Sequence, residues 1–325
     1  MAQVVVFDEF GDADVLRIVD EPISEPAEGE LRVHIDAFGV NRLDQMMRAG
    51  QYPGPIQLPH ARLGIEGSGT VDAVGPGVEG VSVGDKVLIT AVPDADIRGT
   101  YAEYAIVPAN RVIERPPGLD TIGAAALWVS YSTAYGALIE KAAMRPGDHV
   151  LITAASSGVG LAAIQIANQI GAIPLAVTRS SEKEHALLQA GAAAVFTYDS
   201  EEIAPAVRSL TGGLGVDIII DSIMGPGLAQ LASAAKFGGT LVTVGWLDSR
   251  PASFPMNPLT IFRYASFEHT LDPAAVRRIS SFLGAGLRSG ALRPTVDRVF
   301  PFADVADAHR YLEQGHQMGK VVVAR

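Results

Sequence analysis

Residues 149–172 constrain the fold of this chain most, because they predict a strand, a tight turn of small residues and a helix in direct succession. Apolar residues recur at helical spacing over 158–170, so one face of that helix is expected to be buried. Further apolar strand candidates follow, with helical stretches between them, at Pro174–Thr178, Ala194–Tyr198, Val216–Asp221 and Thr240–Gly245. Strands alternating with helices predict βαβ units and a doubly wound parallel sheet, hence an α/β protein.

The chain before Pro116 has a different pattern. Short segments rich in β-branched and aromatic residues are separated by Gly and Pro, at Gln3–Phe7, Leu31–Ala37, Gly69–Val74, Lys86–Ala91 and Tyr101–Val107. This spacing predicts a compact β-rich domain. A helix is expected over Gly123–Lys141. The last strand candidate, Lys320–Ala324, follows a predicted helix at Val305–Gln314 and is expected to return to the first domain.

Length, charge and composition limit the function classes. A chain of 325 residues favours two domains. The net charge of −11 argues against nucleic acid or an anionic membrane as a partner, since both are polyanions. Without cysteine the chain has no disulfide, thiol nucleophile or thiolate metal site. No signal segment or membrane span is visible, so we expect a soluble, cytoplasmic protein.

The turn between the strand and helix of 149–172 has the composition of a phosphate-binding loop. Backbone N–H groups at a helix N-terminus bind a pyrophosphate, and only small residues let it approach. The residues that meet this need are Ala155, Ser156, Ser157, Gly158 and Gly160, and Val159 in the same turn is a further predicted cofactor contact. Ala155 and Ser157 stand where a dinucleotide fingerprint has its first two glycines. An ordinary glycine-rich turn is the alternative.

The residues after the second strand of this region favour NADPH over NADH. An NAD site carries an acidic residue at that strand's tip, which binds the ribose 2′-hydroxyl. Here the strand ends without an acid, and Arg179, Ser180 and Lys183 follow. A guanidinium binds a 2′-phosphate in bidentate fashion, a serine hydroxyl donates to it, and a lysine adds charge. Solvated charges on an exposed turn are the alternative.

The whole pattern resembles the medium-chain dehydrogenase/reductases, in their zinc-free quinone oxidoreductase (zeta-crystallin-like) branch. The resemblance covers nearly the full length. Its landmarks, in order, are Gly39–Asp44, Gly64–Gly69, Gly75–Val78, Gly84–Val87, Gly99–Tyr104, Ala124–Leu127, Ser132–Tyr135, Pro146–Asp148 and Ala154–Gly160.

The resemblance implies a GroES-like β-rich catalytic domain from residues 1–124 and 288–325. A Rossmann NADPH-binding domain, residues 125–287, is inserted between them. The zinc-dependent relatives carry Cys and His ligands at positions that correspond here to Asn41 and Ile65, and their four-cysteine lobe has no counterpart. Zinc needs such ligands, so no metal site is expected. His60 and Glu66 are only a weak indication of a metal site, because the sequence places His60 in a loop.

The family also implies cofactor contacts outside the phosphate turn. Thr133 resembles a nicotinamide-amide contact, and Tyr198 resembles an adenosine-side contact. The other implied contacts end the fourth strand, end or follow the fifth strand, or begin the last one; they are Ser222, Val244, Gly245, Trp246, Lys320 and Val321. The alternatives stay open: Thr133 as a helix residue bonded to its own backbone, Tyr198 as a surface aromatic, Trp246 in the core or a dimer interface, and Lys320 as a solvated edge charge.

Tyr52 and Asn41 are the predicted catalytic residues. In the family, the loop around Tyr52 lies beside the nicotinamide. A phenol is protonated at neutral pH, so it can donate to a carbonyl oxygen or supply a proton after hydride attack. Asn41 could orient the same oxygen or hold the nicotinamide ribose, because an amide both donates and accepts. The alternative for Tyr52 is that its ring only packs under the turn.

These observations predict an NADPH-dependent oxidoreductase that transfers hydride to a quinone or another conjugated carbonyl substrate without zinc. A 2-enoyl-thioester or alkenal double-bond reductase would use the same site. A low-turnover NADPH-binding protein with a structural or regulatory role is the alternative from another class. The family resemblance implies a homodimer paired through the edge of the cofactor-domain sheet, and the apolar run Thr240–Trp246 is expected to supply that edge.

Overall fold

The computed structural model describes residues 1–198 and 202–325. The chain divides into two compact units. The first consists of Met1–Val129, Thr270–Ser280 and Pro294–Arg325, and the second of Ser130–His269 and Ser281–Arg293. The second unit is thus inserted into the first. The predicted domain boundaries, residues 1–124 with 288–325 for one domain and residues 125–287 for the other, stay predictions. None of the helices formed by the described residues is long and apolar enough to span a membrane.

A mixed seven-stranded sheet forms the centre of the first unit. Its strand order is β14 (Val296–Pro301), β15 (Lys320–Ala324), β3 (Glu30–Val40), β4 (Gly67–Val74), β5 (Lys86–Ile89) and β7 (Val112–Glu114), and β6 (Tyr104–Pro108) also pairs with β3. A separate antiparallel pair joins β1 (Ala2–Val6) and β2 (Arg17–Glu21). Every β-segment predicted before Pro116 overlaps one of these strands. Strands β2, β7 and β14 were not predicted.

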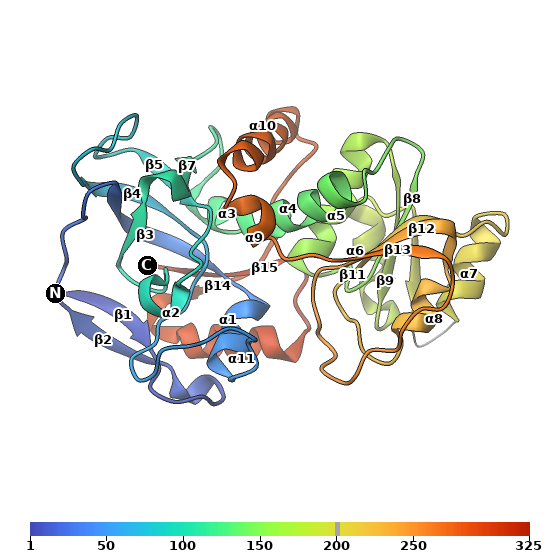
Figure 1. The fold of residues 1–325 in the computed structure, drawn as a ribbon, viewed down its shortest axis with the longest axis horizontal. Coiled ribbons are helices and arrows are strands. Elements are labelled where there is room, and N and C mark those ends of the chain that lie inside the picture. Colours follow the sequence, from blue (N-terminus) through green and yellow to red (C-terminus); the bar gives the residue numbers. More distant parts are fainter. Residues whose placement is uncertain (199–201) are drawn as a thin grey trace. The chain divides into compact units, whose positions relative to one another are not determined.

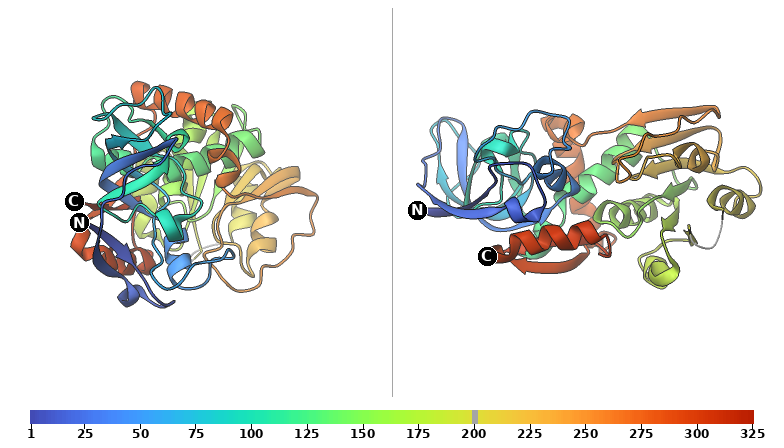
Figure 2. Two further views of the ribbon diagram at one scale, coloured as in Figure 1. Left: turned by 60° about the vertical axis from the view of Figure 1, so that its left-hand side comes forward. Right: turned by 90° about the horizontal axis from the view of Figure 1, so that it is seen from below.

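The last strand, β15, returns to the first unit, as predicted. It pairs antiparallel with β3, so that Val321 is level with Val40, and parallel with β14 (Figure 1). Helix α11 (Val305–Gln314) packs on β14 and β15 (Figure 2). The remaining helices of this unit are short: α1 (Arg42–Arg48), α2 (Ala95–Arg98) and α3 (Thr121–Ala125). The pairing of β3 with β15 brings residues near 40 next to residues near 320.

The second unit is a Rossmann-type layer structure. Six parallel strands lie in the order β10 (Ala194–Thr197), β9 (Ile173–Thr178), β8 (His149–Ile152), β11 (Val216–Asp221), β12 (Ala235–Thr243) and β13 (Leu259–Arg263). The chain order therefore reads 3-2-1-4-5-6, the dinucleotide-binding arrangement, with its switch point between β8 and β11. The predicted fold class is confirmed.

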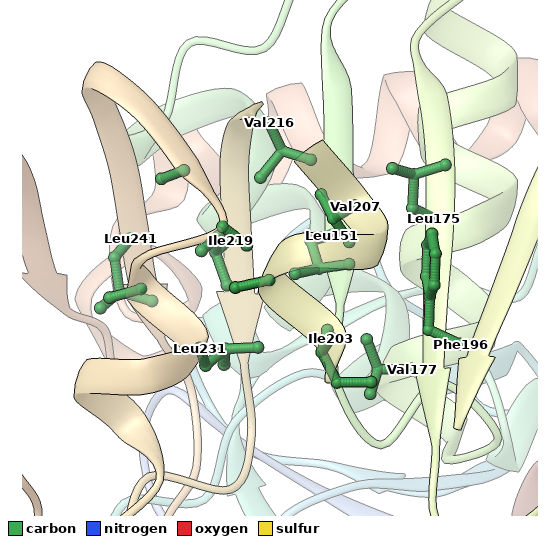
Figure 3. Packing of buried hydrophobic residues seen from close by; sticks show 14 of the residues in the cluster. Leu151, Leu175, Val177, Phe196, Ile203, Val207, Val216, Ile219, Leu231 and Leu241 are labelled. Carbon is green, nitrogen blue, oxygen red and sulfur yellow. The ribbon is translucent and has the colours of Figure 1, made fainter. Parts of the chain in front are cut away.

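Both faces of this sheet are buried, which explains its continuous apolar strands. Leu151, Leu175 and Ile219 face the helices α7 (Ile203–Leu210) and α8 (Leu228–Ala232), with Val207 packed among them (Figure 3). Residues of the opposite parity, such as Val150, are also buried. Helices α5 (Gly158–Ile170), α6 (Glu184–Gln189) and α9 (Phe267–Thr270) complete the unit, and α10 (Pro273–Ser289) carries the chain from one unit to the other.

Two sequence expectations differ from the structure. The helix expected over Gly123–Lys141 is three pieces: α3, then α4 (Trp128–Tyr135), then a π-helical turn over Gly136–Lys141. Helical propensity along this Ala-rich stretch does not reveal such breaks. The run Thr240–Trp246 is not a sheet edge, because β12 pairs with β11 on one side and β13 on the other. The edge strand on this side of the sheet is β13, which was not predicted as a strand.

Candidate active site

The turn between β8 and α5 has the geometry of an anion-binding loop. The Ser157 hydroxyl caps the helix by accepting the N–H of Gly160 at 3.0 Å. Among the described residues, the N–H groups of Gly158 and Val159 have no protein acceptor. A Cβ on Gly160 would lie 2.5 Å from the carbonyl oxygen of Ala155, so only glycine lets the helix start this close to the turn. Two unpaired N–H groups at the N-terminus of a thirteen-residue helix can hold a pyrophosphate.

The positive side chains expected at the 2′-phosphate flank this turn. Lys183 donates from Nζ to Oγ of Ser156 at 3.1 Å, so its ammonium lies at the phosphate loop. Arg179 is exposed and Ser180 half-buried, in the segment directly after β9. No acidic residue occupies the strand's tip, since β9 ends at Thr178. The arrangement offers cations and a hydroxyl where an NAD site would offer a carboxylate.

A buried carboxylate organises the backbone at the ends of β8, β11 and β12. Asp221 accepts the Thr153 hydroxyl at 2.7 Å and the N–H of Met224 at 2.7 Å, and burial raises the pKa of this carboxyl. Thr153 in turn accepts the N–H of Ser222 at 2.9 Å. A Cβ on Gly245 would lie 2.8 Å from the Ser222 carbonyl oxygen. The loops carrying Ser222 and Gly245 are thus fixed against each other at the carboxyl edge of the sheet.

The other cofactor residues expected in the second unit have distinct surroundings. Thr133, on α4, is only 8% exposed. Its hydroxyl bonds to no other described residue, whereas the alternative expected it to bond to the backbone of its own helix. Tyr198 is 47% exposed after β10. Val244 is half-buried and donates its N–H to the Asp221 carbonyl at 2.8 Å. Trp246 is half-buried, with the Arg263 guanidinium carbon 4.2 Å from its ring centroid.

The first unit contains a buried ion pair built on β15 and β3. Lys320 donates from Nζ to Oε1 of Glu66 at 2.5 Å and to Oδ1 of Asn41 at 2.6 Å. Lys320 and Glu66 are 5% and 1% exposed. The second carboxylate oxygen of Glu66 accepts the N–H of Val129 at 2.8 Å. The alternative that Lys320 is a solvated edge charge is therefore wrong, because the β15–β3 pairing encloses it.

Asn41 has little hydrogen-bonding capacity left. Its Nδ2 donates to Oε1 of Glu66 at 3.0 Å and to the carbonyl of Gly39 at 3.2 Å, while Oδ1 accepts from Lys320. Both amide hydrogens are used within the protein, so the remaining capacity is a lone pair on Oδ1. This geometry favours Asn41 as an acceptor for a ribose hydroxyl and disfavours it as a donor to a substrate carbonyl.

Beneath this ion pair, Asp44 joins the two segments that carry Asn41 and Glu66. Its carboxylate accepts the N–H of Asn41 at 2.8 Å, the N–H of Gly64 at 3.1 Å and the hydroxyl of Tyr101 at 3.2 Å. Burial raises the pKa of Asp44 to about 6, and the hydrogen bonds oppose that rise. Tyr101 also lies 3.2 Å from Nε2 of His309, whose pKa burial lowers to about 3. The network holds the ends of β3 and of the 64–66 segment together.

Tyr52 lies in a loop after α1 and is half-buried. Its N–H donates to the carbonyl of Met46 at 3.1 Å, and its ring covers Gly54, where a Cβ would lie 2.5 Å from Cε1 of Tyr52. The hydroxyl bonds to no described residue and is therefore available to a ligand. A half-buried hydroxyl can also bond to water, so the catalytic role of Tyr52 stays a prediction.

The structure groups some predicted residues and separates others. Asn41 and Lys320, with Val321 fully buried beside them, form one group in the first unit, and the phosphate turn with Lys183 forms another in the second. Glu66 was missed as part of the site, although it directly follows the zinc-ligand position Ile65 and is a charge in a glycine-rich, apolar segment. His60 does not meet Glu66; its Nε2 lies 2.7 Å from Oε1 of Glu21.

The comparisons with known proteins agree with this geometry. Residues 27–117 match the alcohol dehydrogenase GroES-like domain, and residues 190–323 match the zinc-binding dehydrogenase domain. Human quinone oxidoreductase is 31% identical over 99% of this chain and 97% of its own length. A Burkholderia 2-haloacrylate reductase is 28% identical over 99% of both. The crystal structure of Escherichia coli quinone oxidoreductase complexed with NADPH superposes with a TM-score of 0.92 at 26% identity, covering both chains completely.

Proposed function

Since the chain belongs to the quinone oxidoreductase branch of the medium-chain dehydrogenase/reductase family, we propose that it transfers hydride from NADPH to a quinone or another conjugated carbonyl substrate without zinc. The observation that carries the coenzyme assignment is the phosphate turn: free N–H groups on α5, the Lys183 ammonium on Ser156, and Arg179 in place of an acid after β9. The E. coli relative was solved with NADPH, which supports the same assignment.

The residues of the second unit fit the polar groups of NADPH. Gly158 and Val159 would bind the pyrophosphate, and Arg179, Ser180 and Lys183 the 2′-phosphate. Ser222, Val244 and Gly245 form the fixed edge along which the rest of the cofactor would lie, with Thr133, Tyr198 and Trp246 as further contacts. When bound, NADPH supplies the hydride.

The first unit supplies polar groups and no metal donor set. Asn41 offers one lone pair of Oδ1 to a ribose hydroxyl, and the Tyr52 hydroxyl can donate to an acceptor oxygen or deliver a proton. At the positions of the zinc ligands stand Asn41 and Ile65, and the neighbouring Glu66 carboxylate is neutralised by Lys320. Within 1–198 and 202–325, no cluster of three or more His, Cys, Asp or Glu residues could hold a metal. Zinc independence remains our prediction.

The proposal is tested by following NADPH oxidation with a neutral quinone and a neutral enone. Turnover with the quinone supports it. Faster turnover with 2-enoyl thioesters or alkenals than with any quinone would favour the double-bond reductase, a reading that the 2-haloacrylate reductase relative also suggests. Tight NADPH binding with no turnover on any acceptor would favour a low-turnover binding protein and reject the proposal.

Arg179→Asp is expected to weaken NADPH binding roughly 10- to 100-fold, because a charge-assisted contact to the 2′-phosphate is lost. The preference for NADPH over NADH should narrow, since a carboxylate can bind the 2′-hydroxyl of NADH. The measurement is the dissociation constant of each coenzyme by fluorescence titration. Arg145→Asp, which makes the same charge change on the turn before β8, is the control. Unchanged NADPH affinity in Arg179→Asp would remove Arg179 from the site.

We also propose a cytoplasmic homodimer. Support comes from β13, an edge strand with unpaired backbone groups, and from exposed apolar side chains in the same unit: Phe254 at 74%, Met256 at 88% and Ile261 at 39%. The edge strand of a second copy can form hydrogen bonds with these backbone groups and cover the apolar side chains. The mass in solution by light scattering tests the dimer.

A further inference from the structure

The guanidinium of Arg263, at the end of β13, packs on the indole ring of Trp246. Elsewhere, arginines such as Arg32, Arg62 and Arg310 form ion pairs with carboxylates. Among the described residues, no carboxylate pairs with Arg263. Its guanidinium lies over the ring of Trp246, 4.2 Å from the centroid, and its one polar contact is a long one, 3.5 Å from Nη1 to the Thr243 carbonyl. The stacking fixes the guanidinium plane and leaves N–H donors unused.

The sheet places Arg263 at the functional edge of the second unit. It ends β13, level with Thr243 on β12, which is level with Asp221 on β11. Ligands of open α/β sheets bind at this carboxyl edge. Trp246 follows Val244 and Gly245, the backbone that Asp221 and Ser222 hold in place.

The strand order gives the distance from Arg263 to the residues expected to bind the cofactor phosphates. Arg179 follows β9, and four strand spacings separate β9 from β13, or about 19 Å. The turn after β8, where the pyrophosphate would bind, is three spacings away, or about 14 Å. Arg263 is therefore too far to share the 2′-phosphate with Arg179. It stands at the far end of the edge, beyond the phosphates of an extended dinucleotide.

No described carboxylate balances the positive charge of the Arg263 guanidinium. Partial burial lowers the pKa of Arg263, since it removes water from the guanidinium without adding a counter-charge. In a chain of net charge −11, an exposed cation that has no carboxylate partner among the described residues and lies beside an aromatic face favours a ligand that is both planar and anionic.

We propose that Arg263 and Trp246 form a subsite for the anionic group of the hydride acceptor, a carboxylate, sulfonate or phosphate carried on a planar conjugated body. The subsite rests on the proposed function, because the acceptor is the molecule reduced there. Arg263 binds the anion through its free N–H donors, and Trp246 holds the guanidinium in place and offers an apolar surface to the conjugated body.

The test compares two hydride acceptors, ortho-naphthoquinone and the same quinone with a sulfonate group on its ring. Both are assayed with the wild type and with Arg263→Gln. The substitution is expected to lower kcat/KM for the sulfonate roughly 10- to 100-fold. With the neutral quinone the change should stay within about threefold, which corresponds to about 0.65 kcal/mol. The dissociation constant of NADPH should not change. Calorimetry with naphthalene sulfonate, which cannot be reduced, should show weaker binding to Arg263→Gln by the same factor.

Two variants control the design. Arg250→Gln removes a guanidinium of the same unit, one that is already paired with Asp248. This change should leave kcat/KM for both acceptors unaffected. Arg263→Lys keeps the charge but not the planar fork, and should recover part of the sulfonate activity. Equal losses on both quinones, no loss on either, or weaker NADPH binding in Arg263→Gln would overturn the subsite. Failure of the wild type to reduce the neutral quinone and a neutral enone would instead reject the proposed function.

Discussion

Replacing Tyr52 with phenylalanine is expected to lower kcat on a neutral enone about 100-fold or more, the range for loss of a general acid. The change removes only the hydroxyl, which bonds to no described residue, while the ring can still cover Gly54. The fold should therefore be retained, together with NADPH affinity. A quinone should lose less, because it accepts hydride readily without a strong acid. Steady-state rates on both acceptors, at saturating NADPH, provide the measurement.

Tyr104→Phe is the matched control for Tyr52→Phe. Tyr104 belongs to the same unit and is half-buried on β6, and its hydroxyl also bonds to no described residue. The control should keep full activity with both acceptors. If Tyr52→Phe also keeps full kcat on the enone and the quinone, water supplies the proton and Tyr52 has a packing role only.

Replacing Lys320 with methionine is expected to cost about 3–5 kcal/mol of stability in the first unit, the range for removing one partner of a buried ion pair. Of its hydrogen bonds to described residues, the Glu66 carboxylate, 1% exposed, would keep those from Asn41 and Val129. Urea unfolding can be followed in a Trp246→Phe background. Trp128, fully buried in the first unit, then becomes the only tryptophan and reports on that unit.

A double variant separates the ion pair from simple packing loss. Lys320→Met with Glu66→Leu removes both charges and should regain at least half of the lost stability, since no uncompensated charge remains buried. Arg17→Met, which breaks an exposed ion pair with Asp8 in the first unit, should cost no more than about 1 kcal/mol. A double variant no more stable than Lys320→Met alone would show that the Lys320 stem, and not the charge, is what the fold requires.

Much of this architecture could be predicted because it is local in sequence. The small residues of the turn after β8 and the absence of an acid after β9 can be seen without a structure, since phosphate turns and strand tips are contiguous segments. Apolar strand cores were also predictable, because both faces of the Rossmann sheet are covered. Strand β13 was missed although Leu259, Ile261 and Phe262 are apolar, because its five residues show no regular alternation that would mark a strand.

The sequence by itself determined the two-part organisation, the Rossmann-type sheet and the cofactor class, because each depends on short-range patterns of turn residues, charge and apolar periodicity. Only the tertiary structure decided which distant residues interact. Lys320 meets Glu66 and Asn41 because β15 pairs with β3, and Arg263 lies over Trp246 because β13 pairs with β12. Such contacts join residues that are far apart along the chain. The register of the sheet, and not any local propensity, sets which charges are buried and paired and which remain available to a ligand.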